Sequence, residues 1–176
     1  MLKMDVVLVV SSAVFLAFAC SMPARAQVST SGYILPVRLA LQGAAEAVRV
    51  CEEKGYSVTA TVVDVSGTPQ VMLRGDHSTI HTKDSAFRKA YTAVTMGPVF
   101  NLDSTSAILG LLSKYPPIAA QALASTPNVA VLPGGVAIKL RDEVIGAIGV
   151  GGSPGGDKDE SCARAGADKI EANLPP

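Results

Sequence analysis

The chain has 176 residues, of which 48% are hydrophobic and 5% aromatic, with 15 basic and 15 acidic side chains and a formal net charge of zero. A length of this order suits one domain with a single hydrophobic core. The chain has no basic stripe or arm, no tryptophan and few aromatic rings, so it lacks the features of a nucleic-acid-binding protein.

Residues 1–26 have the pattern of a secretory signal peptide. An apolar run from Val6 to Ala19 precedes the small-x-small sequence Ala24-Arg25-Ala26, which is typical of a cleavage site. The run is shorter than a comfortable membrane span. We therefore expect export to the periplasm or the medium, and a mature chain of residues 27–176 that forms one domain without a stable membrane span. Cys20 leaves a lipoprotein as an alternative, although the residues before it fit a lipoprotein site poorly.

The first part of the mature chain predicts one helix and one β-hairpin. Residues 34–54 are rich in alanine and carry apolar residues at helical spacing, and Gly55 is well placed to end the helix. Pro36 is acceptable in the first turn. β-Branched residues dominate 57–65, a turn follows at 66–69, and residues 70–74 return as the partner strand.

The middle of the chain predicts three helices. A loop at 75–80 leads into a helix from about residue 81 to Thr95, and Gly97-Pro98 is expected to end it. Alanines and Phe87 keep helical spacing on one face. The charged residues are therefore assigned to the solvated face: Lys83, Asp84, Arg88 and Lys89. Shorter helices are expected at 104–113 and 117–124, and a brief strand at 129–132.

The last part of the chain predicts a second hairpin and a closing helix. Residues 136–140 and 144–150 read as strands joined by a polar reversal. Asp157 and Glu160 then have the spacing that satisfies the free amides at a helix start. Four residues share one face of this helix: Cys162, Gly166, Ile170 and Leu174. Because each hairpin joins consecutive strands, we expect an α+β domain with a mostly antiparallel sheet whose faces are covered by helices.

The sequence Gly151-Gly152-Ser153-Pro154-Gly155 suggests two other functions, and both fail on inspection. It matches the nucleophile elbow of α/β-hydrolases, but that fold needs a histidine after the serine, and both histidines precede it. Pro154 also lacks the N–H that an oxyanion hole requires. A dinucleotide phosphate loop would need its third glycine where Pro154 stands. A tight turn that leads into a capped helix is the interpretation that remains.

Cys51 and Cys162 remain after removal of the signal peptide. An oxidising compartment would let them pair, yet each also falls on the apolar face of its helix, which suits a buried free thiol at least as well. Both interpretations stay open at this point. The chain has no Cys-x-x-Cys motif that would indicate a thiol-based metal or redox site.

Several runs of the chain, taken in order, resemble a known family. They are Val62-Val63-Asp64-Val65-Ser66-Gly67, Leu73-Arg74-Gly75-Asp76, Arg88-Lys89-Ala90-Tyr91-Thr92-Ala93, Leu132-Pro133-Gly134-Gly135-Val136, Val144-Ile145-Gly146-Ala147-Ile148-Gly149-Val150 and Gly156-Asp157-x-Asp159-Glu160. Their order and spacing are similar to those of the GlcG/HbpS-like haem-binding proteins, which are related to the C-terminal domain of PduO-type corrinoid adenosyltransferases. The resemblance covers about residues 35–174.

The resemblance implies a profilin-like fold, in which helices flank an antiparallel sheet of about five strands. It implies homo-oligomers, with octamers among them. It also implies haem or a related tetrapyrrole as the ligand, and haem degradation for some members. The family includes secreted members, which agrees with the signal peptide.

Haem iron accepts His, Met, Cys or Tyr side chains, and the chain has two histidines. His81 stands where family members often carry a histidine, so it is the candidate axial ligand and metal-binding residue. The alternative is a capping or surface histidine. His77 is the second candidate, and it shares a face with His81 only if both are helical. Arg88 is the candidate partner of a haem propionate, with Lys89 as the alternative, unless both belong to the solvated face. Some relatives carry an axial histidine in the first helix, but residues 34–54 contain none.

Three functions stay open on these grounds. The leading one is a secreted or periplasmic haem-binding protein in haem uptake, sequestration or sensing. A haem-degrading enzyme is the second, although the sequence contains no positioned acid–base pair or partnered nucleophile. The third is a module that binds an organic acid or a corrinoid without haem, because this layout also serves ligand sensing and a fold does not fix a function.

Overall fold

The computed structural model describes residues 32–175, so the predicted signal peptide lies outside the described residues. Helices and strands follow in this order: α1 (Val37–Glu53), β1 (Thr59–Asp64), β2 (Pro69–Arg74), α2 (Thr82–Phe100), α3 (Thr105–Leu112), α4 (Pro117–Ala124), β3 (Gly135–Leu140), β4 (Glu143–Gly151) and α5 (Gly156–Glu171). Both predicted hairpins and the predicted helices are present. The α+β class is confirmed.

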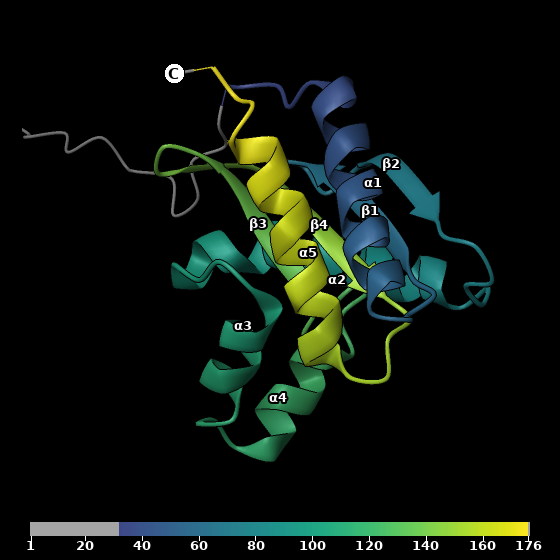
Figure 1. The fold of residues 1–176 in the computed structure, drawn as a ribbon. Coiled ribbons are helices and arrows are strands. Elements are labelled where there is room, and N and C mark those ends of the chain that lie inside the picture. Colours follow the sequence, from purple (N-terminus) through teal and green to yellow (C-terminus); the bar gives the residue numbers. More distant parts are fainter. Residues whose placement is uncertain (1–31, 176) are drawn as a thin grey trace, which may run out of the picture.

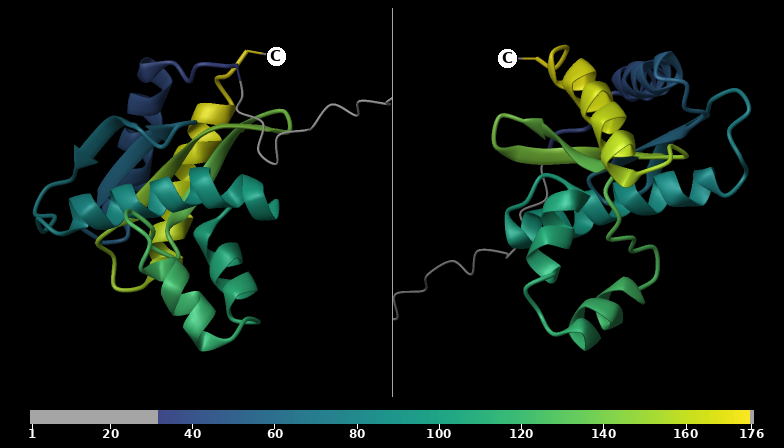
Figure 2. Two further views of the ribbon diagram at one scale, coloured as in Figure 1. Left: turned by 180° about the vertical axis from the view of Figure 1, so that it is seen from behind. Right: turned by 60° about the horizontal axis from the view of Figure 1, so that its bottom comes forward.

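The strands form one antiparallel sheet in the order β2-β1-β4-β3. The terminal helices α1 and α5 lie side by side on one face, and α2 covers the opposite face (Figure 2). α3 and α4 extend beyond one end of the sheet (Figure 1). Within residues 32–175, no helix is long and apolar enough to cross a membrane.

The sheet of the described chain has four strands rather than about five, because residues 129–132 do not pair as a strand. Val129 is buried instead against Met96, Ile108 and Leu112, between α2 and α3. Burial in a small separate cluster explains why this short apolar run resembles a strand in sequence. The expectation of a strand at 129–132 is wrong.

Helix α2 does not end at Gly97-Pro98 but continues to Phe100. Proline lacks an N–H, so Pro98 costs the helix one hydrogen bond near its end rather than in its middle. Asn101 then adopts the left-handed conformation with a φ of 54°, and Leu102 donates its N–H to the carbonyl of Gly97 at 2.9 Å. This C-terminal cap ends the helix one turn later than expected.

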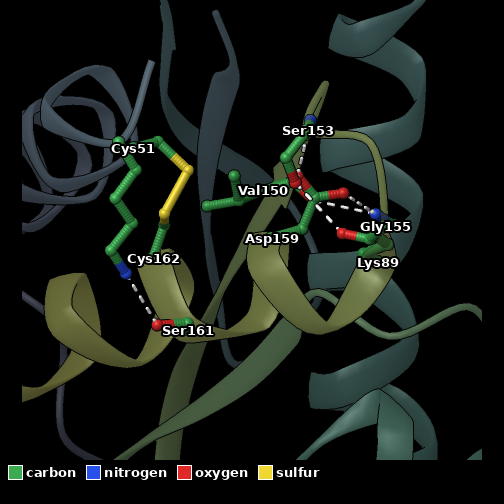
Figure 3. Close-up of a disulfide and its surroundings, with 9 residues drawn as sticks. Cys51, Lys89, Val150, Ser153, Gly155, Asp159, Ser161 and Cys162 are labelled. Atoms are coloured by element: carbon green, nitrogen blue, oxygen red, sulfur yellow. Dashed lines mark hydrogen bonds and ion pairs between the residues drawn. A yellow bond between two sulfur atoms is a disulfide. The ribbon is translucent and has the colours of Figure 1, made fainter. Parts of the chain in front are cut away.

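Helices α1 and α5 touch through small residues and a disulfide. A Cβ atom at Gly43 would lie 2.8 Å from the carbonyl oxygen of Gly166, and one at Gly166 would lie 2.6 Å from that of Gly43. Cys51 and Cys162 form a disulfide between the two helices, with Cα atoms 5.7 Å apart (Figure 3). The structure therefore decides between the two open interpretations of these cysteines in favour of the bond.

Helix α2 approaches the sheet most closely over a pair of glycines. Gly135 of β3 and Gly149 of β4 face each other across the two strands. A Cβ atom at Gly135 would lie 2.2 Å from the carbonyl oxygen of Lys89, and one at Gly149 would lie 2.1 Å from that of Ala86. Neither position has room for a side chain. The close approach brings the N-terminal half of α2 onto the sheet, beside the turn that follows β4.

We expect Gly149→Ala to lower the free energy of unfolding by about 2 kcal/mol or more, because its methyl group would meet helix backbone that cannot rotate away. Gly110→Ala on α3 is the matched control, since a Cβ atom there meets nothing within 4 Å. In a helix this control should gain about 0.5–1 kcal/mol. Urea unfolding measures both, and equal stabilities of the two variants would contradict the close packing.

Candidate functional site

A cavity of about 270 Å³ lies between the start of α2 and the glycine-rich turn after β4. Its walls come from three segments that are distant in sequence. They are the first turns of α2 (His81, Ser85 and Lys89), the segment before β3 (Leu132 and Pro133), and the turn and first residues of α5 (Gly152, Ser153, Gly156 and Asp159). The packing of α2 over Gly149 brings these segments together.

A buried ion pair forms the floor of this cavity. The Nζ atom of Lys89 lies 2.6 Å from Oδ2 of Asp159, and both side chains are 4% exposed (Figure 3). Lys89 also donates to the carbonyl of Val150 at 3.0 Å. Burying a charge is costly unless the charge is paired and hydrogen-bonded. Lys89 supplies the opposite charge and a hydrogen-bond donor to Asp159, and Asp159 supplies the opposite charge and an acceptor to Lys89. The pair connects α2 to β4 and α5.

Ser153, the serine of the nucleophile-elbow motif, has a structural role. Its N–H donates to Oδ1 of Asp159 at 3.0 Å, and its hydroxyl donates to the same oxygen. Gly152 and Gly155 flank this turn with φ values of 133° and 142°, which glycine adopts without a steric cost. No described histidine makes a hydrogen bond with Ser153. The turn therefore fixes Asp159, as expected for a tight turn rather than a hydrolase site.

His81 stands at the mouth of the cavity, on the residue before α2. A buried cluster of hydroxyl groups from Thr59, Ser78 and Thr82 anchors the loop on either side of it, with oxygens 2.7–3.3 Å apart. The Nδ1 atom of His81 lies 3.2 Å from the hydroxyl of Thr79. Nε2 makes no hydrogen bond with a described residue.

Two large apolar side chains near His81 are exposed. Ile80, its neighbour in sequence, is 67% exposed, and Leu132, which lines the same cavity as His81, is 62% exposed. An imidazole accompanied by exposed aliphatic residues offers a flat apolar ligand both contact area and a metal-binding atom. When a histidine binds a metal, its second ring nitrogen usually donates to a neighbour, and Thr79 is placed for that role.

The two histidines do not share a site. His77 is exposed, has a φ of 60°, and lines a different cavity of about 250 Å³ with Glu52, Tyr56 and Asp76. The i,i+4 spacing brings side chains together only within a helix, and His77 lies in the loop before α2. Between residues 32 and 175, no group of three or more His, Cys, Asp or Glu side chains is arranged to hold a metal ion.

Arg88 is exposed, in agreement with its assignment to the solvated face, whereas Lys89 is buried. Arg88 donates from Nη2 to the carbonyl of Val129 at 2.5 Å and does not line the cavity. Lys89, which was assigned to the solvated face, is 3% exposed. Its position on the buried stripe could have been read from its spacing to Ala86 and Ala93, because residues three and four apart lie on one helix face.

Glu160 does not form the predicted capping box of α5. The residue before this helix, Gly155, makes no side-chain cap, and the carboxylate of Glu160 reaches other elements. It accepts the N–H groups of Ser106 and Gly134, each at 3.1 Å, and the hydroxyl of Ser106. Glu160 thus ties α5 to the start of α3 and to the turn before β3.

We expect Glu160→Gln to lower the free energy of unfolding by about 1–3 kcal/mol, because the amide has one acceptor oxygen in place of a carboxylate whose two oxygens both accept hydrogen bonds. Glu53→Gln on the exposed end of α1 is the matched control, since its ion pair with Arg49 is largely solvated. Chemical unfolding measures both. Equal effects of the two substitutions would show that Glu160 does not hold these elements together.

Comparison with known proteins identifies the family. The family model described as haem degrading protein HbpS-like matches residues 35–168. The chain belongs to this family. The resemblance to HbpS-like proteins that the sequence motifs indicated is confirmed.

Solved structures agree with this assignment to the HbpS-like family. A double mutant of HbpS from Streptomyces reticuli is 36% identical, with a TM-score of 0.69 over 80% of this chain and 89% of that chain. The ORFY protein of Klebsiella pneumoniae is 22% identical, with a TM-score of 0.71 over 84% and 97% of the two chains. A complex of PduOC with heme is 24% identical, with a TM-score of 0.67 over 78% and 95%. The last two show the shared fold alone. No curated protein matches the chain.

Proposed function

We propose that this member of the HbpS-like family is an exported haem-binding protein and that His81 is the axial ligand of the haem iron. The observation that carries the proposal is an exposed histidine that lines a cavity, whose Nε2 makes no hydrogen bond with a described residue and whose neighbour Ile80 and cavity partner Leu132 are exposed aliphatic residues. Membership of a family described as haem-degrading, and a heme complex of a protein with the same fold, support haem as the ligand.

The residues present fit such a group. Haem would supply a redox-active iron, and histidine is one of its common protein ligands. Thr79 orients the His81 ring, while Ile80 and Leu132 offer apolar surface to a porphyrin. The cavity is at or below the small end of ligand pockets, which begin at about 300 Å³, so it would hold an edge of the ring rather than enclose it.

Export is the second part of the proposal. The signal-like sequence of residues 1–26 supports it, and so does the disulfide between α1 and α5, because structural disulfides persist mainly in oxidising compartments. An exported haem-binding protein would serve in haem uptake, sequestration or sensing. Cell fractionation with detection of the mature chain starting at Gln27 tests this part.

We also propose that the chain assembles into homo-oligomers, and the octamer is one of the forms that the family resemblance implies. Helix α4 has no buried residue in the single chain, and three apolar side chains of this region are exposed: Ile118, Tyr115 and Leu109. Exposed apolar surface of this kind marks interaction sites. Light scattering during size-exclusion chromatography gives the subunit number, and a monomer at all concentrations would contradict assembly.

We expect His81→Ala to remove or shift the Soret band that forms when haem is added to the mature chain, because the iron loses its ligand from the protein. His77→Ala is the matched control, since His77 is also exposed but lines another cavity. Titration at equal protein concentration compares the two variants with the unsubstituted chain. An unchanged spectrum in His81→Ala, or a change in His77→Ala alone, would exclude His81 as the ligand.

Haem degradation is the second candidate function, and the family description is what favours it. Among the described residues of the cavity we find no partnered nucleophile, but oxidative breakdown of haem needs mainly a bound haem, oxygen and a reductant. Addition of ascorbate to the haem complex in air distinguishes haem degradation from haem binding alone. Steady loss of the Soret band with release of iron indicates degradation, and a stable band indicates binding alone.

A further inference from the structure

The cavity beside His81 contains a buried cation with a hydrogen-bond donor to spare. The ammonium group of Lys89 carries three N–H donors. Two of them have acceptors, which are the carbonyl of Val150 at 3.0 Å and the carboxylate of Asp159 at 2.6 Å. No described residue accepts the third. Because Lys89 lines the cavity and is 3% exposed, a ligand there is the available acceptor.

Ser85 adds a second free polar group. It precedes Lys89 by one turn of α2, so the two side chains lie on the same face, and both line the cavity. The half-buried hydroxyl of Ser85 makes no hydrogen bond with a described residue. A ligand oxygen held by Lys89 would therefore find a further donor nearby.

The one carboxylate of the cavity does not repel an acidic ligand, because its charge is already engaged. Lys89 donates to Oδ2 of Asp159, and the N–H and hydroxyl of Ser153 donate to Oδ1. Conversely, the charge of Lys89 is shared with Asp159, so the site suits a singly charged anion better than a phosphate. A carboxylate carries a single negative charge, and its oxygens can accept the hydrogen bonds that Lys89 and Ser85 have free to donate.

We propose that this cavity is a carboxylate-binding subsite in which Nζ of Lys89 and the hydroxyl of Ser85 hold the acid. The carboxylate can come from two sources. If it is a propionate of the haem bound at His81, the inference rests on the proposed function. If it is a free small carboxylic acid, the inference is independent of the proposed function. The cavity volume of about 270 Å³ accommodates either one propionate arm or one small acid.

The test compares ligands with and without the acid group on three forms of the mature chain. Haem and haem dimethyl ester are titrated by absorbance, and butyrate, a singly charged carboxylate, is titrated by calorimetry. Ser85→Ala is the informative variant, because Lys89 also supports the fold and its substitution can unfold the chain. Ser125→Ala, at the exposed end of α4, is the matched control.

If a propionate occupies the subsite, the ester should bind about tenfold more weakly than haem, and Ser85→Ala should reduce that difference. If a free acid occupies it, butyrate should bind the unsubstituted chain and should bind Ser85→Ala about tenfold more weakly, and the ester should match haem. Equal binding of haem and ester together with no butyrate binding would overturn the subsite. The spectrum of His81→Ala reports on haem ligation separately, so the two proposals fail independently.

Discussion

Replacing Lys89 with methionine should lower the free energy of unfolding by about 3–5 kcal/mol, because it leaves the buried carboxylate of Asp159 without its cation. Both side chains are 4% exposed, so water from the adjoining cavity replaces the lost partner only in part. The N–H and hydroxyl of Ser153 would remain on one oxygen only. Since the pair joins α2 to β4 and α5, we expect the loss to appear as a single cooperative shift of the unfolding transition.

The control for this prediction is Lys83→Met on the same helix. Lys83 pairs with Asp84 at 2.6 Å, but the two side chains are 43% and 66% exposed, so its removal should change stability by less than about 1 kcal/mol. The double variant Lys89→Met/Asp159→Asn should recover part of the loss, because no buried charge remains. If Lys89→Met and Lys83→Met are equally stable in urea, the buried pair does not organise the site.

Removal of the disulfide is the second large expected effect. The Cys51→Ala/Cys162→Ala variant should be less stable by about 4 kcal/mol, because the bond closes a loop of 111 residues and restricts the unfolded chain. Both sulfur atoms are also buried between α1 and α5, so the substitution removes packed volume as well.

Denaturant unfolding with and without reductant measures this effect. The reductant should lower the midpoint of the unsubstituted chain toward that of the double variant, and it should leave the double variant unchanged. Arg49→Ala, on the exposed face of α1, is a suitable control because the Arg49 side chain is 52% exposed and its ion pairs lie within one helix, away from the disulfide. A reductant-independent midpoint of the unsubstituted chain would show that the thiols do not pair.

The elements whose residues repeat with a clear period were predictable from the sequence. The hairpins β1–β2 and β3–β4 alternate or are rich in β-branched residues, and α1 repeats apolar residues at helical spacing. Elements whose limits depend on tertiary contacts could not be predicted from the sequence. Residues 129–132 are apolar because Val129 fills a small cluster, and α2 runs past Pro98 because a cap follows at Asn101.

In the candidate site, too, some residues could be predicted from the sequence and others depend on tertiary contacts. His81 was found as a candidate because of its residue type and its place in the family pattern. Lys89 and Glu160 were misassigned because a charge on a helix or near its start usually faces water or caps the helix. Here each reaches a partner far away in the sequence, Asp159 for Lys89 and Ser106 for Glu160. Pairing of Cys51 with Cys162 likewise depends on how α1 and α5 meet, which the sequence leaves open.

A crystal structure of the mature chain with haem tests the proposed function most directly. We expect the iron bonded to Nε2 of His81, the porphyrin against Ile80 and Leu132, and the mouth of the 270 Å³ cavity covered by one edge of the ring. Haem bound through another residue, or on the face formed by α1 and α5, would contradict the proposed site even if haem binding itself is confirmed.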